Sequence, residues 1–192
     1  MQGYQYNEGK IIAKFFDTSN LDYIVEIGAA DGEDNSNSLH LIWHGAEALL
    51  VEPHPTFYRK LIEKYANNGD VKLCHYAISN AIGWKNLYLN DQCSSVVYVN
   101  SHYISVQCTT LEDLFRLYAV PKNIDFLSVD VEGHDLEVLS SLNFKNYHVK
   151  LVCVEHSMGK EVLDQFMAER DYKLFDRTMG NSFYEKRSSK TI

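Results

Sequence analysis

Five continuous apolar runs divide this chain, with polar stretches between them. Hydrophobic residues within each run follow one another instead of alternating with polar ones. This pattern is typical of strands that are buried on both faces of a parallel sheet. We therefore predict five buried strands, at residues 23–29, 47–53, 71–79, 124–133 and 149–156.

Helical patterns occupy the intervals between these runs. Apolar residues recur at helical spacing in four segments, at residues 58–65, 111–118, 135–142 and 163–167. Thr109 followed by Glu112 has the spacing of a capping box, which predicts the start of the second of these helices. Strands that alternate with helices predict βαβ units with right-handed crossovers in an open α/β sheet.

Two regions depart from this alternation. Residues 172–178 and 182–187 have strand-like composition and flank Gly180-Asn181, a dipeptide that favours a hairpin turn. The sheet is therefore predicted to finish with an antiparallel pair. Residues 83–108 contain two short strand-like runs around the polar stretch DQCSS. We interpret this region as an excursion at one end of the sheet.

Length and charge narrow the classes of protein that fit this pattern. The 192 residues are enough for one domain with a buried core, and we expect a single domain over residues 1–192. The net charge of −8 argues against a broad basic surface, so no nucleic-acid partner is expected. No stretch approaches the ~20 apolar residues that span a bilayer, and the first ten residues contain no apolar signal-peptide core. We therefore expect a cytoplasmic protein.

The four cysteines match no C-x-x-C metal or redox motif. Cys74 and Cys153 lie inside apolar runs, where a buried thiol behaves as a small hydrophobic side chain. We interpret the cysteines as reduced and structural, in agreement with a cytoplasmic location.

Ligands of open parallel sheets bind beyond the carboxyl ends of the strands. The first such end has the sequence E-I-G-A-A-D-G, in which Gly28 and Gly32 allow sharp turning and close approach of the backbone to a ligand. A helix beginning near Asp34 is predicted to direct its N-terminus at a ligand carboxylate or phosphate. The alternative is a tight strand–helix turn with no ligand.

The second strand end carries Glu52, twenty-four residues after Gly28. A carboxylate in this position can accept hydrogen bonds from both hydroxyls of a ribose. The alternative is an acid that only initiates the helix after Pro53. Together, the first two strand ends favour a nucleoside ligand with a carboxylate tail. S-adenosylmethionine has both features, and its sulfonium cation suits the neighbouring acids.

Segments in several parts of the chain resemble one enzyme family. They are VEIGAADGEDNSNSL, LLVEPHPTFYRKL, AISNAIGWKNLYL, SSV, TTLEDLF, IDFLSVDVEGHDLEVL and VCVEH. In this order, across residues 23–157, they resemble the FkbM-type S-adenosylmethionine-dependent methyltransferases. The most specific part is the block D-V-E-G-H-D-x-E-V-L with T-L-E-D-L upstream. The first loop has G-A-A-D-G where many members have G-A-N-x-G.

The resemblance implies a fold, an activity and a set of site residues. The fold is a Rossmann-like class I methyltransferase fold of the α/β class, with a central, mostly parallel seven-stranded sheet, a C-terminal antiparallel hairpin and helices on both faces. The activity is methylation of a hydroxyl on a sugar, a glycan or a glycosylated small molecule. The implied cofactor-binding residues are Glu26, Gly28, Ala29, Asp31, Gly32, Ser38, Glu52, Pro53, Ala77, Ile78 and Asp130.

Within this set, the resemblance places the first-loop residues at the methionine end of the cofactor and Glu52 at its ribose. Ala77 and Ile78 would flank the adenine. Asp130 and Glu132 would stand beside the reacting methyl group.

A hydroxyl acceptor must lose its proton as its oxygen attacks, so a base or a metal ion is needed nearby. The candidate catalytic residues are Asp130, Glu132, His134 and His156, with Glu155 as a further candidate base. Asp130 and Glu132 share strand parity, and two close carboxylates raise one another's pKa. Alternatively, Asp130, Glu132 and His156 hold a divalent cation, Mg²⁺ or Ca²⁺. Both histidines also have a purely structural alternative.

Two other functions stay open at this point. A methyltransferase fold can serve as a non-catalytic nucleoside-binding module. A nicotinamide-dependent oxidoreductase is disfavoured by the missing G-x-G-x-x-G motif. The partner is expected to be a small-molecule or carbohydrate acceptor, recognised by the 83–108 excursion, the N-terminal segment or a partner subunit. The sequence leaves homo-oligomer formation open.

Overall fold

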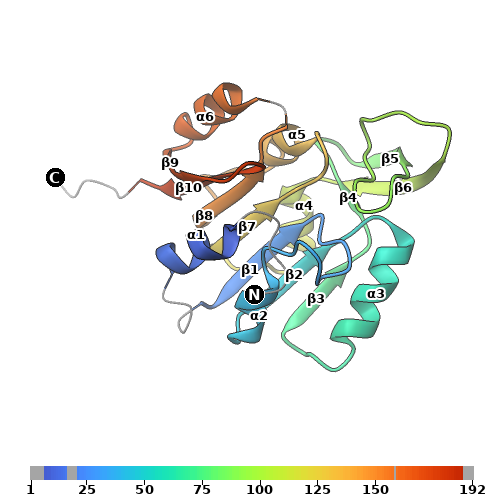
Figure 1. Cartoon of the computed structure of the whole chain (residues 1–192), viewed down its shortest axis with the longest axis horizontal. Coiled ribbons are helices and arrows are strands. Elements are labelled where there is room, and N and C mark those ends of the chain that lie inside the picture. The colour runs from blue at the N-terminus through green and yellow to red at the C-terminus, as the bar shows by residue number, and fades with distance from the viewer. Residues whose placement is uncertain (1–6, 17–20, 158, 188–192) are drawn as a thin grey trace.

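Seven strands form the main sheet, in the order β3-β2-β1-β7-β8-β10-β9 (Figure 1). The structure is a computed structural model that describes residues 7–16, 21–157 and 159–187. The strands of this sheet are β1 (Tyr23–Ile27), β2 (Glu47–Val51), β3 (Val71–Cys74), β7 (Asn123–Val129), β8 (His148–Glu155), β9 (Tyr172–Arg177) and β10 (Asn181–Lys186).

The sheet is parallel from β3 to β8, and β10 runs antiparallel to both β8 and β9. All five residues of β1 are buried, as expected for a strand that is covered on both faces. The predicted mostly parallel sheet with a C-terminal antiparallel hairpin is therefore confirmed. The hairpin turn differs by one residue from the predicted Gly180-Asn181, because Asn181 is already the first residue of β10.

Helices cover both faces of the sheet, as predicted. They are α1 (Glu8–Phe15), α2 (Leu39–Trp43), α3 (Pro55–Tyr65), α4 (Leu111–Leu117), α5 (Asp135–Ser140) and α6 (Lys160–Ala168). Side chains of α1, α2 and α3 pack in one cluster with Ile24 and Leu50, and those of α4, α5 and α6 pack in another with Val25 and Leu49. Neighbouring residues of a strand point to opposite faces, so each strand supplies both clusters. None of the described helices is long and apolar enough to cross a membrane.

A second, three-stranded sheet stands at one end of the molecule (Figure 1). It consists of β4 (Ala77–Ile78), β6 (Tyr103–Thr109) and β5 (Gly83–Tyr88), with β6 in the middle. The predicted excursion therefore forms a sheet of its own. The prediction of one strand over residues 71–79 is wrong, because β3 ends at Cys74 and Ala77 pairs with Cys108 in the small sheet.

Two predicted helix starts also need correction. No helix begins near Asp34, because residues 28–37 form a loop and α2 begins at Leu39. The cap of α4 is Thr110, whose hydroxyl accepts a hydrogen bond from the Asp113 backbone N–H at 3.1 Å. Thr109 is instead the last residue of β6, so the capping motif lies one residue later than predicted.

Candidate active site

A cavity opens at the carboxyl ends of β1, β2 and β7, where the strand order of the main sheet reverses direction. It encloses about 950 Å³, including the space at its open mouth. The small sheet and the loop between β5 and β6 close its far side. Eight of the predicted site residues line it: Gly28, Ala29, Glu52, Pro53, Ala77, Ile78, Asp130 and Glu132.

Gly28 lets the first loop pass directly over the end of β7. Its φ is +85°, and a Cβ atom at this position would lie 1.8 Å from the carbonyl oxygen of Asp130. The backbone N–H groups of Gly28 and Ala29 donate to the carbonyl of Val51, which fixes the loop against β2. A side chain is therefore excluded here by both backbone conformation and space.

Asp31 and Gly32 shape the first loop without lining the cavity. Asp31 accepts hydrogen bonds from the backbone N–H groups of Glu33 and Asp34, both at 3.1 Å, and pairs with Lys60 at 3.3 Å. A Cβ on Gly32 would lie 2.6 Å from the Leu61 side chain, so this glycine allows close packing on α3. The structure places neither residue at the cavity wall, in contrast to the role predicted for them.

Glu26 and Ser38 are buried behind the cavity. The Glu26 carboxylate accepts hydrogen bonds from the Ser36 hydroxyl at 3.0 Å, the Asn37 backbone N–H at 2.8 Å and the Ser38 hydroxyl. Burial raises the pKa of Glu26, and these donors oppose that shift. Both residues hold the segment before α2 in place, and of this group only Ser36 lines the cavity.

Glu52 presents a buried carboxylate to the cavity beside the first loop. Its two oxygens accept hydrogen bonds from the backbone N–H groups of Ala30 at 2.9 Å and His54 at 2.7 Å. Burial raises the pKa of Glu52 to about 7, and the two hydrogen bonds partly oppose that effect. Each carboxylate oxygen can accept a second hydrogen bond, so Glu52 can still receive hydroxyl donors from a ligand.

The opposite wall of the cavity is apolar. It includes Pro53, Ala77 and Ile78, together with Leu87 of β5 and Val96 of the loop that follows. Ala77, Ile78 and Leu87 are buried, so they form a fixed surface. A flat heterocyclic ring fits such a surface better than a charged group does.

Acidic side chains gather where β7 and β8 end. Carboxylate oxygens of Asp130, Asp135 and Glu155 lie within 4.8 Å of one another. Burial raises the pKa of Asp130 well above its ordinary value, and the carboxylates of Glu155, Asp135 and Glu132 add to that effect. Glu155 has one buried oxygen without a hydrogen-bond partner among the described residues.

The predicted metal set of Asp130, Glu132 and His156 is not brought together. His156 faces the hairpin, where Nδ1 lies 3.0 Å from the Ser182 hydroxyl and Nε2 lies 2.9 Å from the Met179 carbonyl. Both ring nitrogens are therefore engaged outside the cavity. Within the described part of the chain, the three acids that could share a cation are Asp130, Asp135 and Glu155.

His134 is buried and does not line the cavity. Its Nε2 lies 3.0 Å from the Ser79 hydroxyl, and its Nδ1 lies 3.7 Å from Glu137. Burial lowers the pKa of His134, which favours the neutral ring. This placement supports the structural alternative for His134, as the hairpin contacts do for His156.

Glu132 lies in the loop after β7, with a φ of +56°. The strand ends at Val129, so the predicted strand parity of Asp130 and Glu132 does not apply. The Ser95 hydroxyl donates to the Glu132 carbonyl at 2.7 Å, which ties this loop to the one between β5 and β6. A left-handed conformation is uncommon for glutamate, and such strain is retained most often at functional sites.

The loop between β5 and β6 contributes residues to which the sequence assigned no individual role. Asp91, Gln92 and Cys93 line the cavity mouth, and the Asn35 side-chain amide donates to Gln92 across it at 3.4 Å. Partial burial, with the charge of Glu132, raises the pKa of the Cys93 thiol to about 11. All four cysteines are free thiols, and Cys93 is the exposed one. The polar DQCSS stretch was the available signal for this wall of the site.

Asp135 gives this site a measurable pH dependence. It accepts hydrogen bonds from the backbone N–H groups of Val131 at 3.0 Å and Gly133 at 3.1 Å, and burial raises its pKa from 3.8 to about 7. The folded protein therefore binds this proton more tightly than the unfolded chain does. Between these two values stability falls as pH rises, by up to about 1.4 kcal/mol for each pH unit.

We expect the Asp135→Asn variant to lose this contribution. Denaturant titrations at pH 5 and pH 7 should show a wild-type free energy of unfolding that is lower at pH 7, and a difference that shrinks by about 2–3 kcal/mol in the variant. Asp70→Asn, at an exposed position at the opposite end of β3, should keep the wild-type difference. An unchanged pH dependence in Asp135→Asn would contradict this assignment.

A comparison with known protein families identifies the family of this chain. The family model described as "Methyltransferase FkbM domain" matches residues 26–174, more than three quarters of the sequence. This chain belongs to the FkbM methyltransferase family. The resemblance seen across residues 23–157 is therefore confirmed. A search of curated proteins finds no match.

Solved structures share the fold of this FkbM-family chain at low sequence identity. The methyltransferase FkbM from Methylobacillus flagellatus KT has 12% identity and a TM-score of 0.55, over 87% of this chain and 44% of its own. This chain thus spans less than half of that protein. TrmK from M. capricolum, in complex with S-adenosyl-homocysteine, has 12% identity and a TM-score of 0.54, over 98% and 72%. A protein of the NADB-Rossmann superfamily from Streptococcus agalactiae has 10% identity and a TM-score of 0.56, over 100% and 73%.

These comparisons confirm the predicted Rossmann-like methyltransferase fold. At such identities they establish the fold alone, so the roles of individual residues must be argued from the cavity itself.

Proposed function

We propose that this chain is an S-adenosylmethionine-dependent methyltransferase that methylates a hydroxyl on a sugar, a glycan or a glycosylated small molecule. The observation that carries the proposal is the position of Glu52, a buried carboxylate that lines the cavity beside the Gly28 turn. We assign the ribose to this carboxylate, because an acid after the second strand accepts hydrogen bonds from ribose hydroxyls in dinucleotide-binding folds. We further propose that residues 1–192 act as one domain in the cytoplasm.

The residues at the cavity fit such a cofactor. The apolar wall of Pro53, Ala77 and Ile78 suits an adenine ring, and Glu52 retains acceptor capacity for ribose hydroxyls. Gly28 lines the cavity and lets the first loop approach the end of β7 closely, which brings the loop backbone to where the methionine portion would lie. When bound, S-adenosylmethionine supplies an activated methyl group at its sulfonium.

The chain's own residues then have two tasks: to hold the acceptor in line with the methyl group and to remove the hydroxyl proton. We assign proton removal to the Glu132 carboxylate. Glu132 lines the cavity, is partly exposed and forms no ion pair with another described residue. Asp130 suits this task less well, because its raised pKa keeps it protonated to higher pH.

A divalent cation held by Asp130, Asp135 and Glu155 is the alternative for activating the hydroxyl. Carboxylate oxygens are ligands that Mg²⁺ and Ca²⁺ accept. If Glu132 is the base, turnover should survive treatment with a chelator. If turnover is lost and then restored by added Mg²⁺ or Ca²⁺, the cation alternative holds instead.

Replacing Glu52 with alanine is expected to weaken cofactor binding at least tenfold. The change removes a charged acceptor of hydrogen bonds, each worth about 1.5–3 kcal/mol, and leaves the N–H groups of Ala30 and His54 without their partner. Calorimetric titration of folded wild type and Glu52→Ala with S-adenosylhomocysteine measures the difference. Equal affinity would show that another acid holds the ribose.

The proposed reaction is tested by incubating the protein with S-adenosylmethionine that carries a labelled methyl group and a panel of hydroxyl compounds. We expect label to appear in an acceptor as a methyl ether, identified by mass spectrometry. Cofactor binding with no transfer to any member of a broad panel would favour a nucleoside-binding module. Label found on nitrogen or carbon would contradict O-methylation while leaving methyl transfer in place.

A further inference from the structure

The Asp, Glu, Lys, Arg and His side chains that line the cavity, among the described residues, all have the same sign of charge. Among the described residues these are five carboxylic acids, contributed by Asp34, Glu52, Asp91, Asp130 and Glu132. No described lysine, arginine or histidine lines the cavity. None of these five acids takes part in the ion pairs that the described residues form. A cavity walled by one sign of charge concentrates ligands of the opposite sign.

Three of these acids lie where an acceptor would enter. Asp34 and Asp91 are exposed on the two loops that face each other across the mouth, and the Asn35–Gln92 hydrogen bond joins the same loops. Glu132 lies further in, in the loop after β7. His54 interacts electrostatically with Asp91, but burial lowers the pKa of His54, which favours its neutral form. It therefore does not offset these carboxylates.

S-adenosylmethionine, the methyl donor, does not by itself neutralise the negative charge of the cavity. S-adenosylmethionine has two positive groups and one carboxylate, so it brings one net positive charge. Burial raises the pKa of Glu52 to about 7 and that of Asp130 well above its ordinary value, so burial reduces the negative charge that these two acids contribute at neutral pH. Asp34, Asp91 and Glu132 then leave the donor-loaded site negative. Burial of an uncompensated charge opposes binding, so a negative acceptor is disfavoured and a positive one is favoured.

We propose that the acceptor is a hydroxyl compound that carries a positive charge, of the amino-sugar or aminocyclitol class. Asp34 and Asp91 attract its ammonium group at the mouth, and a neighbouring hydroxyl reaches Glu132. Acceptors with phosphate, sulfate or carboxylate groups are rejected by the same charges. This inference rests on the proposed function for the use of the cavity, and it adds the class of substrate.

The negative charge at the cavity mouth can be tested at Cys93 without any methyl acceptor. It lines the mouth two residues from Asp91, and it is exposed, whereas Cys74, Cys108 and Cys153 are buried. Two methanethiosulfonate reagents of similar size, one with a trimethylammonium group and one with a sulfonate, would label it. The rate at which each reagent labels Cys93 is divided by the rate at which the same reagent reacts with free 2-mercaptoethanol. A Cys93→Ser variant gives the background.

We expect the normalised rate of the cationic reagent to exceed that of the anionic one at least tenfold at low salt. The ratio should fall towards one in Asp34→Asn/Asp91→Asn and in 1 M salt, and stay high in the distant control Asp70→Asn. The use of a ratio cancels any change in the thiolate fraction of Cys93. A wild-type ratio near one, or a ratio that the double variant leaves unchanged, would overturn the proposal.

The second arm compares related hexoses with different charge: glucosamine, N-acetylglucosamine, glucose and glucose 6-phosphate, each with S-adenosylmethionine. We expect transfer to the amine to exceed transfer to the acetamide at least tenfold, with none to the phosphate. Equal use of the acetamide or preference for the phosphate would contradict the proposal. Where none of the four is methylated, the labelling ratio decides. Binding of S-adenosylhomocysteine, measured separately, shows whether the proposed function itself stands.

Discussion

Glu132→Gln is expected to lower turnover about 100-fold or more, the scale on which general base catalysis contributes. Glutamine keeps the shape of the side chain but cannot accept the hydroxyl proton. The backbone of this position should persist, because the Ser95 hydroxyl donates to the carbonyl of residue 132 and not to its side chain. Thermal stability and affinity for S-adenosylhomocysteine should therefore change little, and steady-state kinetics on a confirmed acceptor measure the loss.

A Ser94→Ala variant is the matched control for that experiment. Ser94 also lines the cavity, but its hydroxyl bonds within its own loop, to the Asp91 carbonyl at 2.6 Å and the Asn90 backbone N–H at 2.9 Å. It should reduce turnover far less than Glu132→Gln does. Near-normal turnover in Glu132→Gln would exclude Glu132 as the base and make Asp130 the better candidate.

Gly28→Ala is expected to lower both the stability of the protein and its affinity for the cofactor. The added Cβ would lie 1.8 Å from the Asp130 carbonyl oxygen, so the end of β7 and the first loop must separate. Overpacking and a left-handed residue together cost about 2–5 kcal/mol of stability. Because the same movement displaces both walls of the cavity, we expect affinity for S-adenosylhomocysteine to fall at least tenfold in calorimetric titrations.

Substitutions at two other glycines distinguish backbone strain from steric overlap as the cause of that loss. Gly45 has a φ of +91°, and nothing lies within 4 Å of the place that a Cβ would take, so Gly45→Ala introduces backbone strain alone. Gly69 has open space and no positive φ, so Gly69→Ala should be nearly neutral. Affinity should stay at the wild-type level in both. If Gly28→Ala is as stable and binds as well as Gly69→Ala, the close approach of the first loop to β7 is not a feature of the protein in solution.

The strand ends were predictable because a strand that is buried on both faces has a continuous apolar run in the sequence. Continuous apolar runs located β1, β2, β7 and β8, and the residues just after them include Gly28, Glu52 and Asp130 at the cavity wall. The run at 71–79 misled because its apolar residues are shared between β3 and β4, which belong to different sheets. The hydrophobic pattern indicates that a segment is buried, but it does not indicate which sheet a strand joins.

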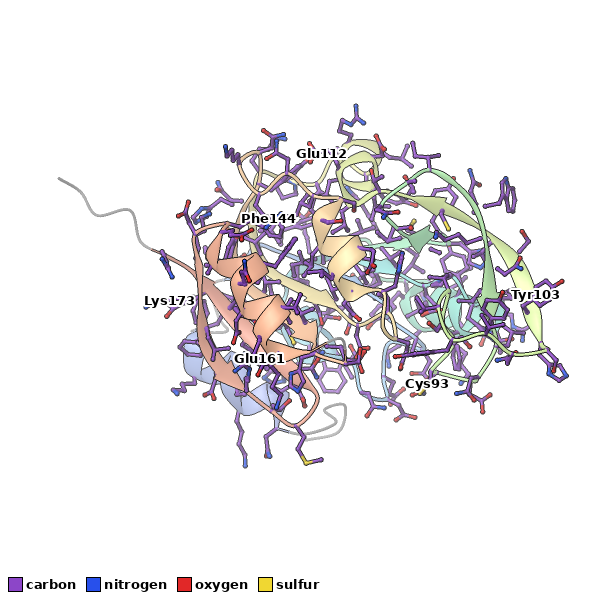
Figure 2. The ribbon with its side chains drawn as sticks, turned by 90° about the horizontal axis from the view of Figure 1, so that it is seen from above. Cys93, Tyr103, Glu112, Phe144, Glu161 and Lys173 are labelled. Carbon is purple, nitrogen blue, oxygen red and sulfur yellow. The ribbon has the colours of Figure 1, made fainter. Side chains whose placement is uncertain are left out.

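Residues whose contacts depend on how the loops fold could not be assigned in this way. Cys93, labelled in Figure 2, and Asp91 line the cavity because the Ser95–Glu132 hydrogen bond ties the β5–β6 loop to the loop after β7. Glu26 and Asp31 have the composition of ligand-binding residues, but the structure directs their carboxylates at backbone N–H groups of the first loop and the segment before α2. His156 followed a buried strand, as Glu52 did, yet the adjoining hairpin engages its ring.

The central claim is that the cavity at the ends of β1, β2 and β7 binds a nucleoside cofactor, and isothermal titration with S-adenosylhomocysteine tests it most directly. We predict saturable binding with one site per chain for the wild type, weakened at least tenfold in Glu52→Ala. Circular dichroism on the same samples establishes that both proteins are folded. Heat no greater than that of dilution, from folded wild-type protein at saturating ligand, would contradict the account.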